Sequence, residues 1–156
     1  MYSVTLHTSA SFETANEAVA HEVLSSMLEC LVQLNVALMR SQRFPPLYTT
    51  HVRYRQEPLG QENWRDAAIV LRDGYGDCED LSAYRVAELR VMYKVPARCV
   101  FRWRTFMVDG KTRVKLYHIL VGVPHEGKLL IEDPSKRLGM PAHAPERTMT
   151  SDLSLG

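Results

Sequence analysis

The sequence predicts an α+β domain, in which a central helix packs on an antiparallel sheet of three to four strands and a long helix lies near the N-terminus. In the first half of the chain, apolar residues recur every three or four positions, which is helical spacing. In the second half, three runs rich in β-forming residues are separated by the turn dipeptides Asp109-Gly110 and Glu126-Gly127. Strands joined by such short turns are antiparallel, and helices followed by strands are typical of the α+β class.

Length and composition favour one domain. The chain has 156 residues, of which 46% are apolar and 24% charged, and this is enough to bury a proper core. We expect a single domain over residues 1–156, with its core at about 60–140. A strand, helix and loop would occupy residues 1–59, and a tail residues 141–156.

Charge and cysteine usage indicate the compartment. A net charge of +1 gives no general attraction to nucleic acid or anionic membranes, so we expect neither as a partner. The first 20 residues lack a basic leader with an apolar stretch, and no uninterrupted apolar run reaches the length of a membrane span. Three cysteines without paired spacing favour reduced thiols. We therefore expect a protein that is cytoplasmic at synthesis.

The N-terminal half yields four expected elements. Residues 2–7 alternate apolar and polar side chains and predict a short edge strand. Residues 12–39 predict a long amphipathic helix, beside whose apolar face Cys30 would be a packed thiol. Phe44-Pro45-Pro46 ends that helix, residues 47–58 predict an extended loop or short strand, and residues 62–72 a short helix. The predicted apolar face of the long helix consists of Val19, Val23, Met27, Leu31, Leu34 and Leu38.

A glycine turn opens the central helix. Gly74 and Gly76 interrupt regular structure, and Asp77 offers a side chain that can cap the N-terminus of the next helix, whose helix-forming sequence continues from Leu81 to about Tyr93. Asp80 stands three residues later, as a capping box requires. Cys78 then lies in the first turn, where the partial positive charge of a helix end favours a thiolate. Its backbone N–H, expected to be free there, is a natural oxyanion donor.

Histidine and aspartate stand on the last two predicted strands. The hairpin around Glu126-Gly127 pairs residues 113–123 with residues 128–133, and equidistance from the turn predicts that His118 and Asp133 are neighbours. A carboxylate can fix the tautomer of an imidazole, which then takes a proton from a thiol. Together with Cys78, these residues form a candidate nucleophile, base and orienting group.

The acidic residues around Cys78 oppose its activation. Asp77, Glu79 and Asp80 would raise the thiol pKa unless they cap the helix or bind basic groups such as Arg85 or Arg137.

The segments Gly74-Tyr75-Gly76-Asp77-Cys78-Glu79-Asp80-Leu81, Tyr117-His118 and Glu132-Asp133-Pro134-Ser135 resemble the transglutaminase-like superfamily of papain-type cysteine enzymes. With Arg137-Leu138-Gly139-Met140, they are more similar to the small transglutaminase-like proteins of bacteriophages and prophages. The similarity covers residues 64–140. It implies a papain-like core with a catalytic triad at Cys78, His118 and Asp133. Glu79 departs from the family pattern, which often has an aromatic residue there.

The resulting functional expectation is a cysteine-dependent acyl-transfer enzyme without a cofactor, acting on a peptide or other amide. Water is the default acyl acceptor, so a peptidase or amidase is favoured over a transglutaminase with an amine acceptor. The alternative is a phage or prophage assembly protein, virion-associated, that keeps the fold as a binding module for other particle proteins. Trp64 or Tyr75 could supply a second oxyanion donor, although packing roles are commoner for such residues.

The remaining cysteines and histidines do not indicate a metal site or a second catalytic site. A zinc site from Cys78, Cys99, His118, His125 and His143 lacks the paired spacing of structural zinc ligands, so we expect no metal site. His7, His21, His125 and His143 have no partner pattern and are expected at the surface.

Overall fold

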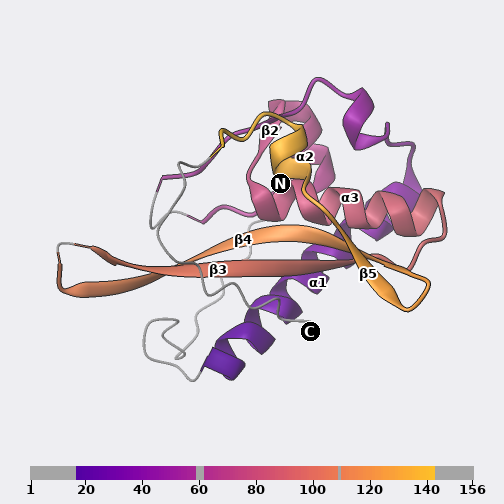
Figure 1. Cartoon of the computed structure of the whole chain (residues 1–156). Coiled ribbons are helices and arrows are strands. Elements are labelled where there is room, and N and C mark those ends of the chain that lie inside the picture. The colour runs from indigo at the N-terminus through magenta and orange to yellow at the C-terminus, as the bar shows by residue number, and fades with distance from the viewer. Residues whose placement is uncertain (1–16, 59–61, 109, 143–156) are drawn as a thin grey trace.

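The computed structural model describes residues 17–58, 62–108 and 110–142. It has the predicted mixed α+β architecture, with a long N-terminal helix, a central helix and a three-stranded antiparallel sheet (Figure 1). In chain order the elements are α1 (Glu17–Ser41), the 3-10 helix η1 (Leu47–Thr49), β1 (Arg53–Tyr54), α2 (Ala67–Asp73), β2 (Tyr75–Gly76), α3 (Cys78–Met92), β3 (Arg98–Val108), β4 (Thr112–His125), β5 (Lys128–Glu132) and α4 (Pro134–Arg137). The predicted edge strand at residues 2–7 and the tail from residue 143 onward lie outside the described residues.

The main sheet follows the order β3-β4-β5. The first predicted hairpin is confirmed, since β3 pairs with β4 over the whole length of β3; its turn residue Asp109 lies outside the described residues. In the second hairpin, His125 pairs with Lys128 across the two-residue turn Glu126-Gly127. Both turn residues have positive φ, 48° and 74°, as a type I′ hairpin turn requires. β5 ends at Glu132, one residue earlier than expected.

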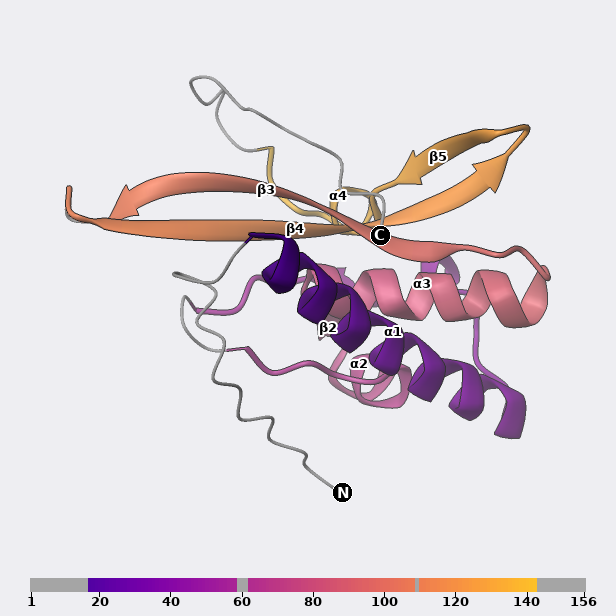
Figure 2. The same ribbon diagram turned by 90° about the horizontal axis from the view of Figure 1, so that it is seen from below.

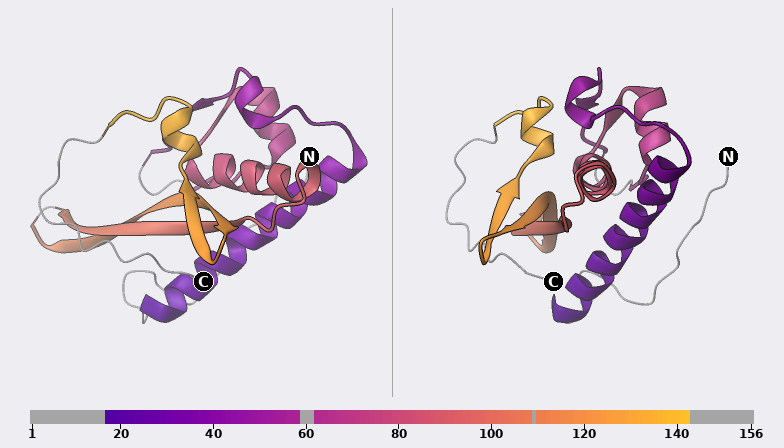
Figure 3. Two further views of the ribbon diagram at one scale, coloured as in Figure 1. Left: turned by 45° about the vertical axis from the view of Figure 1, so that its right-hand side comes forward. Right: turned by 90° about the vertical axis from the view of Figure 1, so that its right-hand side faces the viewer.

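The helices α1 and α3 lie on the same side of the long β3–β4 ribbon (Figure 2). Viewed along α3, this helix stands between the sheet and α1 (Figure 3), and it contacts both. Eleven of its 15 residues are buried, which confirms the prediction of a central helix. The first turn of α3, with Cys78, is thereby held against the sheet.

A second, smaller sheet was not predicted. Within the segment expected as a loop or short strand, β1 pairs in parallel with β2, so that Arg53 lies opposite Tyr75 and Tyr54 opposite Gly76. Two-residue strands carry no periodicity that a sequence could show. The pairing brings Tyr54 beside the segment that leads into Cys78.

The helices α2 and α3 start at positions set by their caps. α2 begins at Ala67 rather than at residue 62, because the Asp66 side chain accepts a hydrogen bond from the Ile69 backbone N–H at 3.0 Å. It ends at Gly74, whose φ of 79° is left-handed. α3 begins at Cys78, as the predicted N-cap Asp77 requires, and Asp77 and Asp80 form the capping box.

The buried face of α1 is rotated from the predicted one by about one residue position. Val19 and Leu34, predicted to be buried, are 45% and 48% exposed, and Cys30 is exposed rather than packed. Asn35 is fully buried instead, because its Oδ1 accepts a hydrogen bond from the Ala67 backbone N–H at 2.8 Å. The N-terminus of α2 therefore helps to set which face of α1 turns inward. The buried residues of α1 are Ala20, Leu24, Leu28, Leu31, Val32, Asn35, Val36 and Met39.

By length and composition alone, α1 would suffice to cross a membrane, a property that it shares with core helices of soluble proteins. In the fold it packs against α3, β3 and α2. This arrangement is consistent with a core helix.

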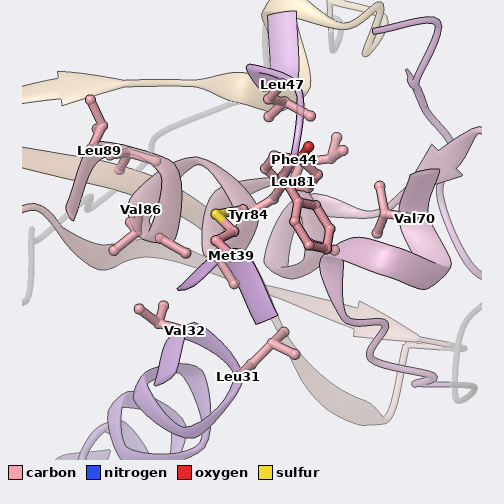
Figure 4. Close-up of a cluster of buried hydrophobic side chains, with 14 of the residues drawn as sticks. Leu31, Val32, Met39, Phe44, Leu47, Val70, Leu81, Tyr84, Val86 and Leu89 are labelled. Atoms are coloured by element: carbon pink, nitrogen blue, oxygen red, sulfur yellow. The ribbon is translucent and has the colours of Figure 1, made fainter. Parts of the chain in front are cut away.

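The main hydrophobic core joins α1, η1, α2 and α3 (Figure 4). Leu81 and Val86 of α3 are fully buried, as is Tyr84, whose hydroxyl donates a hydrogen bond to the Pro45 backbone oxygen at 2.7 Å. Burying each such aliphatic side chain stabilises the fold by about 1.5–3 kcal/mol. A second cluster, around Cys78, Phe101 and Ile119, connects α1 and α3 to the sheet. The candidate site lies at that junction.

Candidate functional site

Cys78 is positioned by the glycine turn and the capping box before it. The Asp80 side chain accepts a hydrogen bond from the Asp77 backbone N–H at 3.2 Å. A Cβ at Gly76 would lie 3.0 Å from the Asp80 Cβ and 3.2 Å from Leu81 Cδ2, so only glycine leaves room for this close approach. The turn therefore fixes where α3 begins and where the thiol points.

The Cys78 thiol is buried and meets an acidic partner. Cys78 is 9% exposed and packs with Phe101 and Ile119. Cys78 Sγ donates a hydrogen bond to Glu79 Oε2 at 3.2 Å. Burial raises the pKa of the thiol well above its usual value, the charges of Glu79 and Asp77 add to this, and a hydrogen bond with the Ile119 backbone opposes it. The resting side chain is therefore a neutral thiol.

Two of the three acidic neighbours serve the helix rather than the thiol. Asp77 is the N-cap, and its Oδ2 accepts a hydrogen bond from the Glu57 backbone N–H at 2.9 Å. Asp80 accepts hydrogen bonds from Arg65, from the backbone N–H at 2.7 Å and from Nη1 at 3.2 Å. The basic partner is thus Arg65, rather than the expected Arg85 or Arg137.

Glu79 is the exception, because it faces the thiol. It is 5% exposed, and its Oε1 has no hydrogen-bond partner among the described residues. Burial raises the pKa of Glu79 to about 8, and the charges of Asp80 and Asp77 contribute. Near neutral pH much of Glu79 is protonated, which limits the negative charge beside Cys78.

Glu79 also belongs to a group of three carboxylates. One oxygen from each of Glu57, Glu62 and Glu79 lies within 4.8 Å of the others. Burial raises the pKa of Glu62, and the charges of Asp77 and Glu57 add to the effect. Three such oxygens could coordinate a hard cation. None of these three glutamates belongs to the set of cysteines and histidines considered from the sequence as zinc ligands.

His118 and Asp133 are in contact, as predicted, but not through the predicted register. His118 Nε2 lies 3.0 Å from Asp133 Oδ2. Burial alone would raise the pKa of Asp133, but hydrogen bonds from His118 and from the Lys136 backbone N–H outweigh it and lower the pKa. Asp133 is the N-cap of α4, just beyond β5. The register was wrong by two residues: extending the observed pairing would place Ser135, not Asp133, opposite His118. The contact is therefore diagonal.

Cys78 contacts β4, the strand that carries His118, at Ile119, the residue after His118. The Ile119 backbone hydrogen-bonds with the thiol and, through its oxygen, accepts a bond from Ser82 Oγ of α3 at 3.1 Å. Side chains alternate along a strand, so His118 is directed to the other side of β4 from Ile119. No hydrogen bond joins Cys78 to His118 within the described ranges. The structure thus forms the histidine–aspartate pair, whereas the thiol lies on the Ile119 side of β4 and is bonded to Glu79.

The expected oxyanion donors have other partners. The Cys78 backbone N–H, expected to be free, donates to Asp77 Oδ1 at 2.7 Å. The Trp64 indole N–H donates to Glu62 Oε2 at 3.4 Å. The Tyr75 ring lies beneath the guanidinium groups of Arg55 and Arg65, at 4.5 and 5.0 Å. The two N–H groups are therefore engaged, and the Tyr75 ring packs against arginine side chains.

Sequence reasoning missed Tyr54. Burial raises the pKa of its phenol, the charges of Asp77 and Cys78 add to the effect, and so does a hydrogen bond between the phenol and the Asp77 side chain. Tyr54 also packs beside Cys78 in the second hydrophobic cluster. Its position depends on the parallel β1–β2 pairing, so no local signal marked it. Its hydroxyl has Asp77, the N-cap of α3, as its hydrogen-bond partner.

His21, expected at the surface, was also misplaced. Its ring packs against Phe101, Trp103 and Tyr117, with ring centroids 5.1, 4.3 and 5.8 Å away. Burial lowers the pKa of His21. This aromatic group fills the face of β3 and β4 next to Cys78. His125 is exposed, as expected, whereas His7 and His143 lie outside the described residues.

Comparisons of the chain with family models, curated proteins and solved structures found no match.

Proposed function

We propose that this chain is a cysteine-dependent hydrolase that cleaves an amide bond of a peptide or related substrate, with Cys78 as nucleophile, His118 as base and Asp133 as the residue that orients His118. The observation that carries the proposal is the 3.0 Å contact between His118 Nε2 and Asp133 Oδ2, on the strand whose next residue meets the Cys78 thiol. A carboxylate at one ring nitrogen leaves the other, Nδ1, to accept a proton.

The neutral thiol implies general-base catalysis rather than a preformed thiolate–imidazolium pair. This step requires the Cys78 side chain to leave Glu79 and this part of β4 to shift, so that His118 Nδ1 comes within hydrogen-bonding distance of Sγ. Nδ1 then takes the thiol proton as Sγ attacks the substrate carbonyl carbon. The carbonyl oxygen becomes an oxyanion, to which the Tyr54 hydroxyl donates a hydrogen bond in place of its bond to Asp77. The imidazolium then protonates the leaving amine, and the C–N bond breaks to give a thioester.

Water resolves the thioester. Neutral His118 removes a proton from the water molecule as its oxygen attacks the thioester carbonyl, and returns that proton to Sγ as the acid product departs. An amine in place of water would give transamidation. This series of reaction steps is the one that the resemblance to the transglutaminase-like superfamily implies. A cysteine at the start of a helix that packs on an antiparallel sheet supports membership in that superfamily, with a papain-like core.

A binding module is the second candidate, as in an assembly protein of a phage particle. The observation that favours it is the burial of Cys78 and its hydrogen bond to Glu79. Under this alternative, Glu79 keeps the thiol neutral and inert, and the surface near Cys78 and His118 serves only for contact with a partner.

Acyl capture distinguishes the two candidates. The full chain is incubated with p-nitrophenyl acetate, and the acetylated residue is identified by mass spectrometry of intact protein and peptides. We expect rapid modification of Cys78 that is lost in Cys78→Ser and slowed at least about 100-fold in His118→Gln. His125→Gln, at an exposed histidine, is the matched control and should react like the wild type.

Equal acetylation of Cys30, Cys78 and Cys99, unaffected by His118→Gln, would contradict the enzyme proposal and support the binding module. For a reactive enzyme, release of amine from peptide, isopeptide and cell-wall amide substrates then identifies the substrate class.

A further inference from the structure

A pocket away from Cys78 lies where η1, β1 and the end of α4 meet. Its volume is about 370 Å³, and Tyr48, Arg53, Arg137, Leu138 and Gly139 line it. This volume is within the range of small-molecule sites, about 300–1,000 Å³. None of these lining residues belongs to the proposed catalytic group. The pocket is therefore a separate feature of the surface.

Two arginines bring positive charge into this pocket without a carboxylate. Elsewhere Arg65, Arg85 and Arg90 each form ion pairs with acidic side chains. Arg53 Nη1, by contrast, donates to the Val52 backbone oxygen at 3.0 Å, and the Arg137 guanidinium stacks on the Tyr48 ring at 3.8 Å. Among the described residues neither forms an ion pair. Two like charges in one pocket repel each other unless an anion lies between them.

The pocket is held in shape by hydrogen bonds of its backbone. The Tyr54 backbone N–H donates to the Leu138 oxygen at 3.0 Å, which joins β1 to the end of α4. The Arg53 backbone N–H donates to the Gly74 oxygen at 3.0 Å. The Tyr48 hydroxyl donates to Glu132, so the ring beneath Arg137 is fixed. A preorganised site loses less entropy on binding than a mobile one.

We propose that this pocket binds an oxyanion, a carboxylate or phosphate group, between the guanidinium groups of Arg53 and Arg137. A guanidinium presents paired N–H donors that match the two oxygens of either group. Stacking on Tyr48 leaves the edge of the Arg137 guanidinium, where these donors lie, free for a ligand. The site acts independently of the Cys78 chemistry, so an inactive Cys78 variant retains it.

Nuclear magnetic resonance tests this proposal on the full chain. Inorganic phosphate and, separately, acetate are titrated against sodium chloride at equal ionic strength, while the arginine Nε–Hε signals and the Gly139 amide signal are followed. We expect saturating shifts at Arg53, Arg137 and Gly139. Tighter binding of phosphate would indicate a phosphorylated ligand, and equal or tighter binding of acetate a carboxylate such as a peptide terminus.

Substitutions supply the controls. Arg53→Gln and Arg137→Gln should each weaken binding by about tenfold or more. Arg137→Lys keeps the charge without the planar pair of donors and should be intermediate, and circular dichroism checks that each variant is folded. Arg40→Gln, at an exposed arginine of α1, should bind like the wild type. Shifts that do not saturate, or that match those with chloride, would overturn the proposal, as would unchanged binding by both Arg→Gln variants.

Discussion

Replacing Glu79 by glutamine tests how the buried carboxyl controls the site. The substitution keeps the shape of the side chain but removes its ability to ionise. Glu79 is 5% exposed, and burial, with the charges of Asp80 and Asp77, raises its pKa from 4.5 to about 8. The folded protein therefore retains the proton over a pH range in which the unfolded chain has lost it.

The sign of the effect on stability follows from this difference. Below pH 4.5 both states are protonated, and Glu79 adds no pH dependence. Between pH 4.5 and about 8 the unfolded chain releases its proton while the folded protein keeps it, so stability falls as pH rises. At about 1.4 kcal/mol per pH unit, the upper limit of this loss is about 5 kcal/mol. Because Asp77, Asp80 and Glu62 share the ionisation cost, we expect about 1–3 kcal/mol.

Urea unfolding of the wild type and Glu79→Gln from pH 5 to pH 9 measures the effect. The two proteins should be about equally stable at pH 5, and the variant should be the more stable by about 1–3 kcal/mol at pH 8.5. Glu126→Gln, at an exposed glutamate, is the control and should change little at either pH. A difference that does not vary with pH, or a variant that is less stable at pH 8.5, would refute the reasoning.

Three further substitutions test particular contacts. Asp133→Asn removes the charge that orients His118 and should lower acyl capture by roughly 10²–10⁴ without unfolding the protein; unchanged kinetics would remove Asp133 from the catalytic group. Asn35→Ala strands the buried Ala67 N–H and should cost about 1–3 kcal/mol in urea unfolding; wild-type stability would show that this bond contributes nothing. Gly76→Ala places a Cβ 3.0 Å from that of Asp80, and a loss of about 1–3 kcal/mol is expected; thermal unfolding at the wild-type temperature would contradict the packing argument.

Local signals in the sequence predicted the elements that position the thiol and the histidine. The capping box Asp77…Asp80 and the hairpin turn Glu126-Gly127 act within four residues, so each is visible in a short stretch. The register of β4 with β5 was missed because Pro124 and His125 were counted as loop, although they continue the strand. The His118–Asp133 contact survived this error because a diagonal neighbour is still within reach.

Contacts between distant segments could not be predicted in the same way. Tyr54 reaches Cys78 through a two-residue parallel pairing that has no sequence pattern. The side chain of Glu79 could have pointed to solvent or to the thiol, and only the packing of α3 on the sheet decides between them. The inward face of α1 depends on where α2 supplies a donor for Asn35. In each case the deciding atom comes from a segment remote in the chain.

The pH dependence of Cys78 alkylation by iodoacetamide, in the wild type and in His118→Gln, tests most directly whether the imidazole serves this thiol. If it does, Cys78 at pH 7 should react at least about tenfold faster in the wild type than in the variant, while the exposed Cys30 reacts equally in both. Identical Cys78 profiles in the two proteins would show that sulfur and ring do not cooperate, and would leave the fold as a binding module.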